Sequence, residues 1–367
     1  MRREMHHVGV LVILCCFHTS HVAGDESCSA APSSTTFTHE RALLTVQAAA
    51  APTNAVVPIR GRGADAPFLH VVYGNWSEMP DSIGPPESAA FPLVAQASHS
   101  GGELPPVADY AVAAADLLSS KLTSHGAVLL RGLPLSEICR EHPFPDVRCS
   151  AAYSAFIEAL EVRIGWQAVK SAGGGTIRKD IQHNVRTASE EPCEHTIEPH
   201  MDMAHTAAHP KKIAFFCAAG PPAGVGGETV LTNMRGVSAS LQALGLPEEF
   251  AAHGGVAYRK RLWSTEHVSH SFTWQQFFFT DHLSGALEAV RKRDPNAKVI
   301  DDATDVIEFE ETLAAVHSHP TTGEALWFNG VHTNHKSYYE EALHIDTSDG
   351  SPMHTAYADG EEIPETT

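Results

Sequence analysis

The chain has 367 residues, of which 43% are hydrophobic, so it is long enough to bury one large core or two smaller ones. Acidic residues outnumber basic residues by 44 to 25, which gives a formal net charge of -19. This charge argues against nucleic acid or an anionic membrane as the main partner, because both would repel the protein.

Residues 1–24 are typical of a signal peptide, because Arg2 and Arg3 precede the apolar run "VGVLVILCCF" and small residues follow it. The run is shorter than the about 20 residues that a membrane-spanning helix needs, so we expect cleavage near Gly24 and no stable membrane span. A true signal peptide places the chain in the secretory pathway or outside the cell; otherwise we expect it in the cytoplasm or an organelle. The cysteines beyond residue 24 show neither a paired framework nor a CxxC metal spacing.

Residues 25–90 are rich in Ala, Ser, Thr, Pro and Gly, which indicates a low-complexity lead-in or linker. Ordered structure is expected from about residue 91. Apolar residues at helical spacing between Asp109 and Gly126 predict a helix over 109–126. The run "AVLLRGLPL" at 127–135 predicts a buried strand, and residues 150–165 predict a second helix.

From residue 212 the pattern changes to short β-type runs, "KIAFFCA", "ETVLTN" and "EALWFNG", separated by Gly/Pro turns. Such runs are typical of a sandwich or a barrel. We therefore expect residues 91–367 to form one mainly β domain with flanking helices.

The segment "HMD" places His200 and Asp202 two residues apart. On a strand both side chains would point to one face, where an imidazole and a carboxylate supply two of the three ligands of an Fe(II) facial triad. The spacing alone is not specific, since His344 and Asp346 repeat it.

The surrounding segments resemble the taurine dioxygenase (TauD/TfdA-like) family of Fe(II)/2-oxoglutarate-dependent oxygenases, particularly its clavaminate synthase-like branch. The resemblance rests first on "PHMDM", "HPKKIAFFC" and "GPPAGVGGET". Four further segments support it, namely "HGAVLLRGLPL", "SAGGGTIRKDI", "TGEALWFNGVH" and "YADGEEIPE". It covers residue 91 to the last residue and implies a double-stranded β-helix (jelly-roll) core.

The resemblance implies that His200 and Asp202 bind Fe(II) and that Thr229 helps to hold 2-oxoglutarate. Arg178 and Asn184 match positions on the substrate side, although both also suit a structural loop. The aromatic residues Trp327 and Phe328 are expected to pack in the core, next to Asn329.

The family's distal histidine, the third iron ligand, and its 2-oxoglutarate-binding arginine have no matching positions before Thr367. We therefore expect a jelly roll that lacks its last strands, as in a truncated gene model. Substitute ligands would have to come from the late histidines, His332, His335, His344 and His354. No arginine follows Arg293, and the lysine at 336 is a poorer match for a planar carboxylate.

The implied activity is hydroxylation of a small organic substrate, coupled to conversion of 2-oxoglutarate and O2 to succinate and CO2. One alternative is a catalytically silent pseudoenzyme that retains the fold as a binding module. Another is a cupin-like metal hydrolase or isomerase that uses His200 and Asp202 without a cosubstrate, which the GGET segment with Thr229 disfavours.

Overall fold

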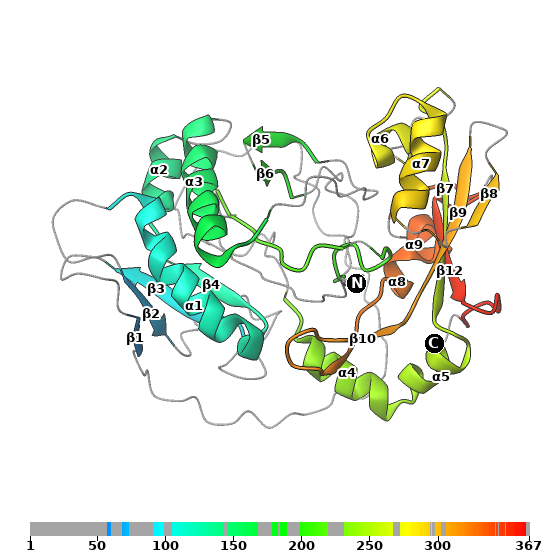
Figure 1. Cartoon of the computed structure of the whole chain (residues 1–367), viewed down its shortest axis with the longest axis horizontal. Coiled ribbons are helices and arrows are strands. Elements are labelled where there is room, and N and C mark those ends of the chain that lie inside the picture. The colour runs from blue at the N-terminus through cyan, green and yellow to red at the C-terminus, as the bar shows by residue number, and fades with distance from the viewer. Residues whose placement is uncertain are drawn as a thin grey trace, which may run out of the picture.

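The computed structural model describes residues 57–59, 68–72, 91–98, 105–142, 146–167, 178–188, 199–218, 231–266, 272–301, 306–348 and 350–364, apart from positions 132, 183, 208, 294, 296, 297, 342 and 344. The expected signal peptide, Thr229, the GGET turn and His344 lie outside these residues. Figure 1 shows two larger sheets toward opposite ends of the long axis, each with its own helices.

The first sheet has the order β1-β2-β3-β4, formed by Val57–Ile59, Phe68–Val72, Leu93–Ser98 and Val128–Arg131. Strands β1 to β3 pair antiparallel, whereas β3 and β4 run parallel and are connected through a helix. The strand predicted over 127–135 is confirmed as β4. Strands β1 and β2 lie within residues 25–90, where composition indicated a linker. Their segments "VPI" and "FLHVV" are apolar, but they are short within a long stretch rich in Ala, Ser, Thr, Pro and Gly, so overall composition did not reveal them.

The two predicted helices are confirmed as α1 (Tyr110–His125) and α3 (Val147–Ile164). Helix α1 ends at Gly126, whose φ of 79° suits a residue without a Cβ atom. Helix α3 begins earlier than expected because the carboxylate of Asp146 accepts a hydrogen bond from the Arg148 amide at 2.9 Å. A short helix α2 (Leu135–Glu141) precedes α3.

A disulfide between Cys139 and Cys149 joins α2 to α3. The sequence showed no paired cysteine framework, because these two residues are ten positions apart and carry no motif. Packing of the two helices brings them together, and both cysteines are buried.

Helices α1 and α3 bury one face of the first sheet in a shared apolar core, which includes Leu93, Ala95, Val128, Leu130, Leu117 and Phe156. On the opposite face, Ile213 and Phe215 pack against Ala127 and Leu129. The prediction that "KIAFFCA" forms a strand is wrong, since residues 212–218 have no strand assignment. In the part of the chain that the structure describes, no strand pairs with this segment; apolar alternation specifies its packing but cannot supply backbone partners.

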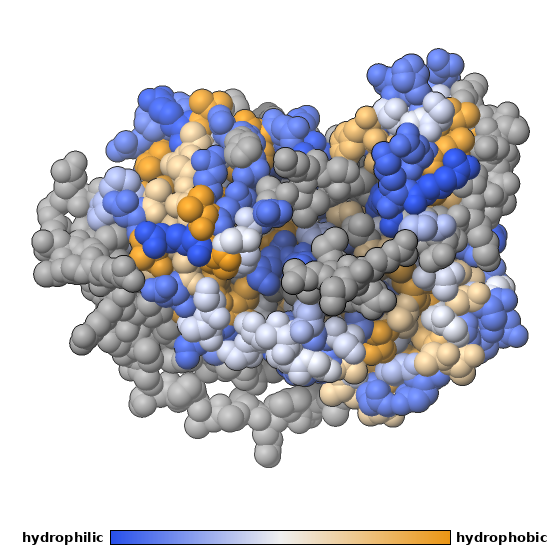
Figure 2. All heavy atoms as spheres, in the orientation of Figure 1, coloured by the Kyte–Doolittle hydropathy of each residue, from blue (hydrophilic) through white to orange (hydrophobic). Residues whose placement is uncertain are grey.

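The second sheet is antiparallel, with the order β12-β7-β9-β8. Its strands are β7 (Val256–Leu262), β8 (Lys298–Asp301), β9 (Ile307–Leu313) and β12 (Met353–Tyr357). Its apolar face packs against α6 (Trp274–Phe278), α7 (Leu283–Arg293) and α9 (Lys336–Glu341). Figure 2 shows hydrophilic residues on the outward side of α7, whose Ala286 and Val290 are buried against the core.

The remaining elements are the 3-10 turn Val107–Asp109, the hairpin β5–β6 (Asp180–Gln182, Val185–Arg186), α4 (Met234–Ala243), α5 (Leu246–Ala252), the hairpin β10–β11 (Val316–Ser318, Ala325–Trp327) and α8 (Val331–Asn334). Strand β11 confirms the strand expected within "EALWFNG". No helix among the described residues is both long enough and apolar enough to cross a membrane.

The expected mainly β architecture with a jelly-roll core is not confirmed by the described residues. Helices hold more of these residues than strands do, and the strands form two four-stranded and two two-stranded sheets. Closure of a jelly roll requires the sheets to contribute facing, consecutively paired strands. The segments predicted to supply such strands, 212–218 and 228–233, either have no strand assignment or lie partly outside the described part.

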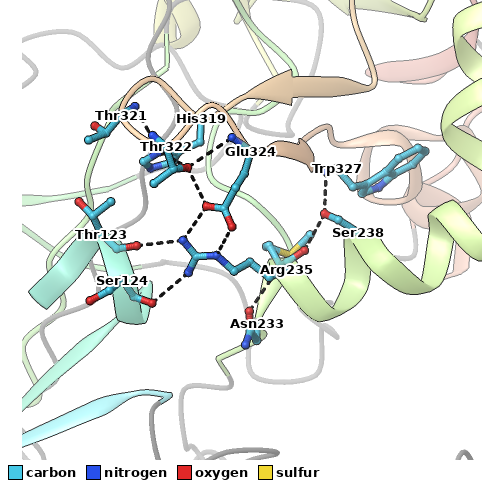
Figure 3. Close-up of polar contacts among 11 residues, drawn as sticks. Thr123, Ser124, Asn233, Arg235, Ser238, His319, Thr321, Thr322, Glu324 and Trp327 are labelled. Atoms are coloured by element: carbon cyan, nitrogen blue, oxygen red, sulfur yellow. Dashed lines mark hydrogen bonds and ion pairs between the residues drawn. The ribbon is translucent and has the colours of Figure 1, made fainter.

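Arg235 connects three distant parts of the chain (Figure 3). Its guanidinium donates to both carboxylate oxygens of Glu324, from Nε at 2.7 Å and from Nη2 at 2.8 Å. It also donates to the backbone carbonyls of Thr123 at 2.9 Å and Ser124 at 3.2 Å, in the last turn of α1. Helix ends leave carbonyls without intrahelical partners, so Arg235 joins α1, α4 and the β10–β11 hairpin through groups that need a donor.

We expect Arg235→Gln to lower the free energy of unfolding by about 1 kcal/mol at neutral pH, because partly exposed ion pairs contribute little. Arg235 and then Thr322 lower the pKa of Glu324 from 4.5 to about 2. The stabilisation is therefore complete above about pH 4.5 and is lost as pH falls toward 2, so wild type and variant should converge in that window. Urea unfolding at several pH values measures this difference. The control is Lys292→Gln, which removes an exposed ion pair between Lys292 and Glu288 within helix α7. Equal stability of Arg235→Gln and wild type at pH 7 would contradict the assignment.

Candidate functional site

His200 and Asp202 lie in an irregular segment that turns at residues 202–205, so the expected strand geometry at this point is wrong. The turn is closed by a hydrogen bond from the Ala204 amide to the Met201 carbonyl at 3.2 Å, and Met203 has a φ of 56°. The two side chains are nevertheless brought together, with His200 Nε2 lying 3.7 Å from Asp202 Oδ1. A turn therefore achieves the convergence that alternation on a strand would have produced.

Asp202 is the more enclosed of the two residues, and Arg178 Nη2 lies 3.4 Å from its Oδ1. Burial by itself would raise the pKa of Asp202, but the contact with His200 and the charge of Arg178 outweigh it. The pKa of Asp202 is therefore lower than its ordinary value. The carboxylate is ionised at neutral pH, which is the form that a metal ligand requires.

The donor atoms of His200 and Asp202 fit one metal ion. Ligand distances of about 2.0–2.2 Å from imidazole nitrogen and carboxylate oxygen allow both atoms to reach a shared ion after a small adjustment. Among the described residues, no further His, Cys, Asp or Glu completes a three-residue ligand set with this pair. Arg178 also contacts the same carboxylate oxygen that would bind the ion.

The late histidines considered as substitute ligands take different positions. His332 Nε2 lies 2.8 Å from the carbonyl oxygen of Pro199, next to the His200 segment. His335 and His354 instead lie together beside β12, with ring centroids 5.0 Å apart. Among the three of these histidines that the structure describes, His332 is thus the residue that contacts the candidate site.

The other predicted site residues have mainly structural contacts. Asn184 lies at the tip of the β5–β6 hairpin with a φ of 61° and donates to the Glu161 carboxylate of α3 at 3.2 Å. Phe328 is buried, and Trp327 packs edge-on against Phe250, as expected for core aromatics. Asn329 is fully buried and donates to the Ala315 carbonyl at 2.9 Å.

A buried polar cluster behind the turn was not anticipated from the sequence. Lys260 and Glu311 form a fully enclosed ion pair across β7 and β9, and Lys260 Nζ also donates to the His205 carbonyl at 2.8 Å. Enclosure of the His205 ring, followed by the charges of Lys260, Arg293 and His200, holds the pKa of His205 well below its ordinary value. The signal was the alternation in "VAYRKRL", where Lys260 shares the inward face with Tyr258 and Leu262.

The chain belongs to a family of dioxygenases, the taurine catabolism dioxygenase TauD, TfdA family, whose sequence pattern matches residues 89–366. One relative is the dapdiamide synthesis protein DdaC of Enterobacter agglomerans, which is 25% identical over 260 residues, covering 66% of this chain and 68% of that protein. Another is a clavaminate synthase-like protein of Arabidopsis thaliana, 33% identical over 112 residues, covering 30% of this chain and 28% of that protein. The resemblance seen in the motifs is thereby confirmed, and the family's fold is the jelly roll.

Proposed function

We propose that this protein is an Fe(II)- and 2-oxoglutarate-dependent oxygenase that hydroxylates a small organic substrate. The observation that carries the proposal is the juxtaposition of His200 and Asp202, at 3.7 Å, within a chain that belongs to the TauD/TfdA family. Family membership supports oxygenase chemistry in general, while these two side chains supply the imidazole and carboxylate donors that such an iron site needs.

In this proposal His200 and Asp202 hold the iron, which would supply the oxygen activation that protein side chains cannot perform. The protein contributes the position and the charge state of these ligands. His200 presents a nitrogen lone pair when its imidazole is neutral, and Asp202 is kept ionised by its neighbours. Thr229 is proposed to contact 2-oxoglutarate, and Arg178, which already faces Asp202, is proposed to orient an anionic group on the substrate side.

A second candidate function is a silent relative that retains the fold as a binding module. The Arg178–Asp202 contact favours it, because an arginine that neutralises the carboxylate can replace the metal electrostatically. The two functions differ in one respect that is simple to measure. The oxygenase needs iron and consumes 2-oxoglutarate, whereas the binding module does neither.

We expect the purified chain, supplied with Fe(II), 2-oxoglutarate and O2, to form succinate at a slow rate even without its substrate. Chelation of the metal should abolish this formation, and Fe(II) should restore it, whereas Zn²⁺ should not, because zinc has no redox chemistry. Succinate is measured by mass spectrometry with isotopically labelled 2-oxoglutarate. Absence of succinate together with weak iron affinity would favour the binding module. Metal-dependent turnover at a rate that does not change when 2-oxoglutarate is removed would favour a hydrolase or isomerase.

A further inference from the structure

Apart from the His200 segment, three metal-ligating side chains converge beside the second sheet. His335, His354 and Glu362 each place one ligand atom within 4.8 Å of the others. His354 Nε2 lies 3.0 Å from Glu362 Oε2. Two imidazoles and one carboxylate form a donor set that suits zinc, cobalt, nickel and ferrous ions.

The backbone holds these three residues in place. His335 lies at the junction of α8 and α9, and His354 lies on β12, which pairs with β7 (Figure 1). The hydroxyl of Thr355 donates to the Val331 carbonyl at 3.0 Å and so attaches β12 to α8. The convergence therefore follows from the packing of whole elements, which limits how far the ligands must move to bind an ion.

Glu362 follows the turn after β12 and is positioned from both sides. The amide of Tyr357 donates to the Glu361 carbonyl at 2.8 Å, and Ile363 is buried in the core. The side chain of Glu362 is itself largely exposed, so its carboxylate can adjust to an ion without disturbing the core. A fixed backbone with one adjustable ligand suits a site that takes up its metal after folding.

The histidine nitrogens support the same reading. His354 Nδ1 is buried and has no hydrogen-bond partner within the described structure, which costs free energy unless another group satisfies it. Because His354 Nε2 is the nitrogen that faces Glu362, an ion shared by these two side chains would be bound through Nε2, and Nδ1 would keep its proton. The Ser337 amide donates to His335 Nδ1 at 3.3 Å, and the Ser337 hydroxyl oxygen lies 2.8 Å from the same nitrogen, so Nδ1 is an acceptor here. Binding of an ion through Nε2 would require the ring to change tautomer, and Nδ1–H would then donate to the hydroxyl oxygen. Metal-ligating histidines commonly donate their second ring N–H in this way.

A pocket of about 350 Å³ opens beside two of these side chains, His354 and Glu362, and its lining also includes Lys336, Arg259, Arg261 and Glu308. The two arginines do not leave an uncompensated positive field, since Arg259 lies 3.3 Å from Glu310 and Arg261 lies 3.4 Å from Glu308. Lys336 adds a third positive charge to the lining, which the carboxylate of Glu362 balances, so the pocket has no net positive charge that would repel a cation. The pocket also leaves space for water or an anionic ligand at the remaining coordination positions.

A second cluster, His253 with Asp359 and Glu361, provides a contrast. It has one imidazole instead of two, and both carboxylates are exposed. His253 Nδ1 lies 2.7 Å from Asp359, and its ring stacks on Tyr357 at 4.2 Å. These contacts account for it as a surface ion pair, so it serves as an internal control.

We propose that His335, His354 and Glu362 form a second metal site, which binds one divalent transition-metal ion of the zinc or cobalt type with at least one position open to the pocket. This site shares no residue with the His200 and Asp202 pair. The proposal of this second site is therefore independent of the oxygenase proposal.

The test uses the full chain without an affinity tag, in a His200→Ala/Asp202→Ala background that removes the candidate iron ligands. Co²⁺ is titrated in, and binding is followed by its visible absorption and by calorimetry. We expect one Co²⁺ per chain. His354→Gln or Glu362→Gln removes a direct ligand. Each should weaken Co²⁺ binding by at least about 10- to 100-fold, which is the usual effect of losing a residue that only hydrogen-bonds to a ligand. Ser337→Ala, which removes a partner of His335, should weaken binding about tenfold.

His253→Gln is the matched control and should leave Co²⁺ affinity unchanged, while thermal unfolding confirms that each variant is folded. Failure of the background variant to bind Co²⁺ overturns the proposal. It is also overturned if His354→Gln and His253→Gln weaken binding equally, because the ion would then be bound by scattered surface histidines. Succinate formation by the wild-type chain reports on the other site, so the two proposals can fail separately.

Discussion

Lys260→Met is expected to lower the free energy of unfolding by about 3–5 kcal/mol, because it leaves a buried charge without its partner. Lys260 and Glu311 are both almost completely inaccessible to solvent, and the ammonium also donates to the His205 carbonyl. Loss of the ammonium would strand the Glu311 carboxylate, whose Oε1 already has no hydrogen-bond partner in the described structure. Urea unfolding followed by circular dichroism measures the difference.

Two further variants separate the charge effect from simple loss of packing. Lys260→Met/Glu311→Leu removes both charges and should recover most of the lost stability, since replacing a buried ion pair with apolar residues is often neutral. Arg259→Met, one residue away on the exposed face of β7, breaks an ion pair with Glu310 in which the arginine side chain is 52% exposed. We expect it to cost less than about 1 kcal/mol. A similarly small cost for Lys260→Met would show that its ammonium is hydrated in solution.

Asp202→Asn is expected to reduce iron-dependent succinate formation at least about 100-fold, since even outer-shell partners of metal ligands contribute 10- to 100-fold. The substitution preserves the shape of the side chain but removes the negative charge that favours a divalent ion. It also keeps an oxygen that can accept from Arg178, so the turn at residues 202–205 should be retained. Succinate formation and Fe(II) affinity are measured on the same preparation.

Asp180→Asn is the matched control, because Asp180 is also paired with an arginine, with Arg186 Nε at 2.6 Å from its Oδ1. Asp180 lies on β5 and is largely exposed, so its loss should leave succinate formation unchanged. If Asp202→Asn and Asp180→Asn behave alike, Asp202 is not an iron ligand. That result would contradict the assignment of Asp202 as an iron ligand, and it would not affect the assignment of the chain to the TauD/TfdA family.

The polar cluster of Lys260, Glu311 and His205 links these two predictions. Lys260 holds the carbonyl of His205, three residues after Asp202 and within the same turn. Variants at position 260 should therefore loosen the turn that places Asp202 beside His200. Stability and succinate formation are expected to fall together for Lys260→Met but not for Arg259→Met.

Much of the helical structure was determined by local sequence. Helices α1 and α3 and strand β4 were predicted because apolar spacing and terminal glycines act within a few residues of each other. Acidic caps did not carry these predictions, since Asp109 makes no side-chain cap hydrogen bond and the Asp146 cap of α3 was not foreseen. The family, too, was evident from short ordered motifs, and the match over residues 89–366 confirms it. These signals are local, so a single sequence contains them in full.

The tertiary structure alone decided which distant groups meet. The register of β7 on β9 pairs Lys260 with Phe309 and Tyr258 with Glu311, which brings the side chains of Lys260 and Glu311 together. These residues are about fifty positions apart, and no local pattern specifies that alignment. The same holds for Arg235 with the end of α1, and for His335, His354 and Glu362. Conversely, the apolar segment 212–218 has the alternation of a strand, but none of the described strands pairs with it. A strand exists only with a hydrogen-bonded neighbour, and that neighbour is a property of the whole fold rather than of the segment.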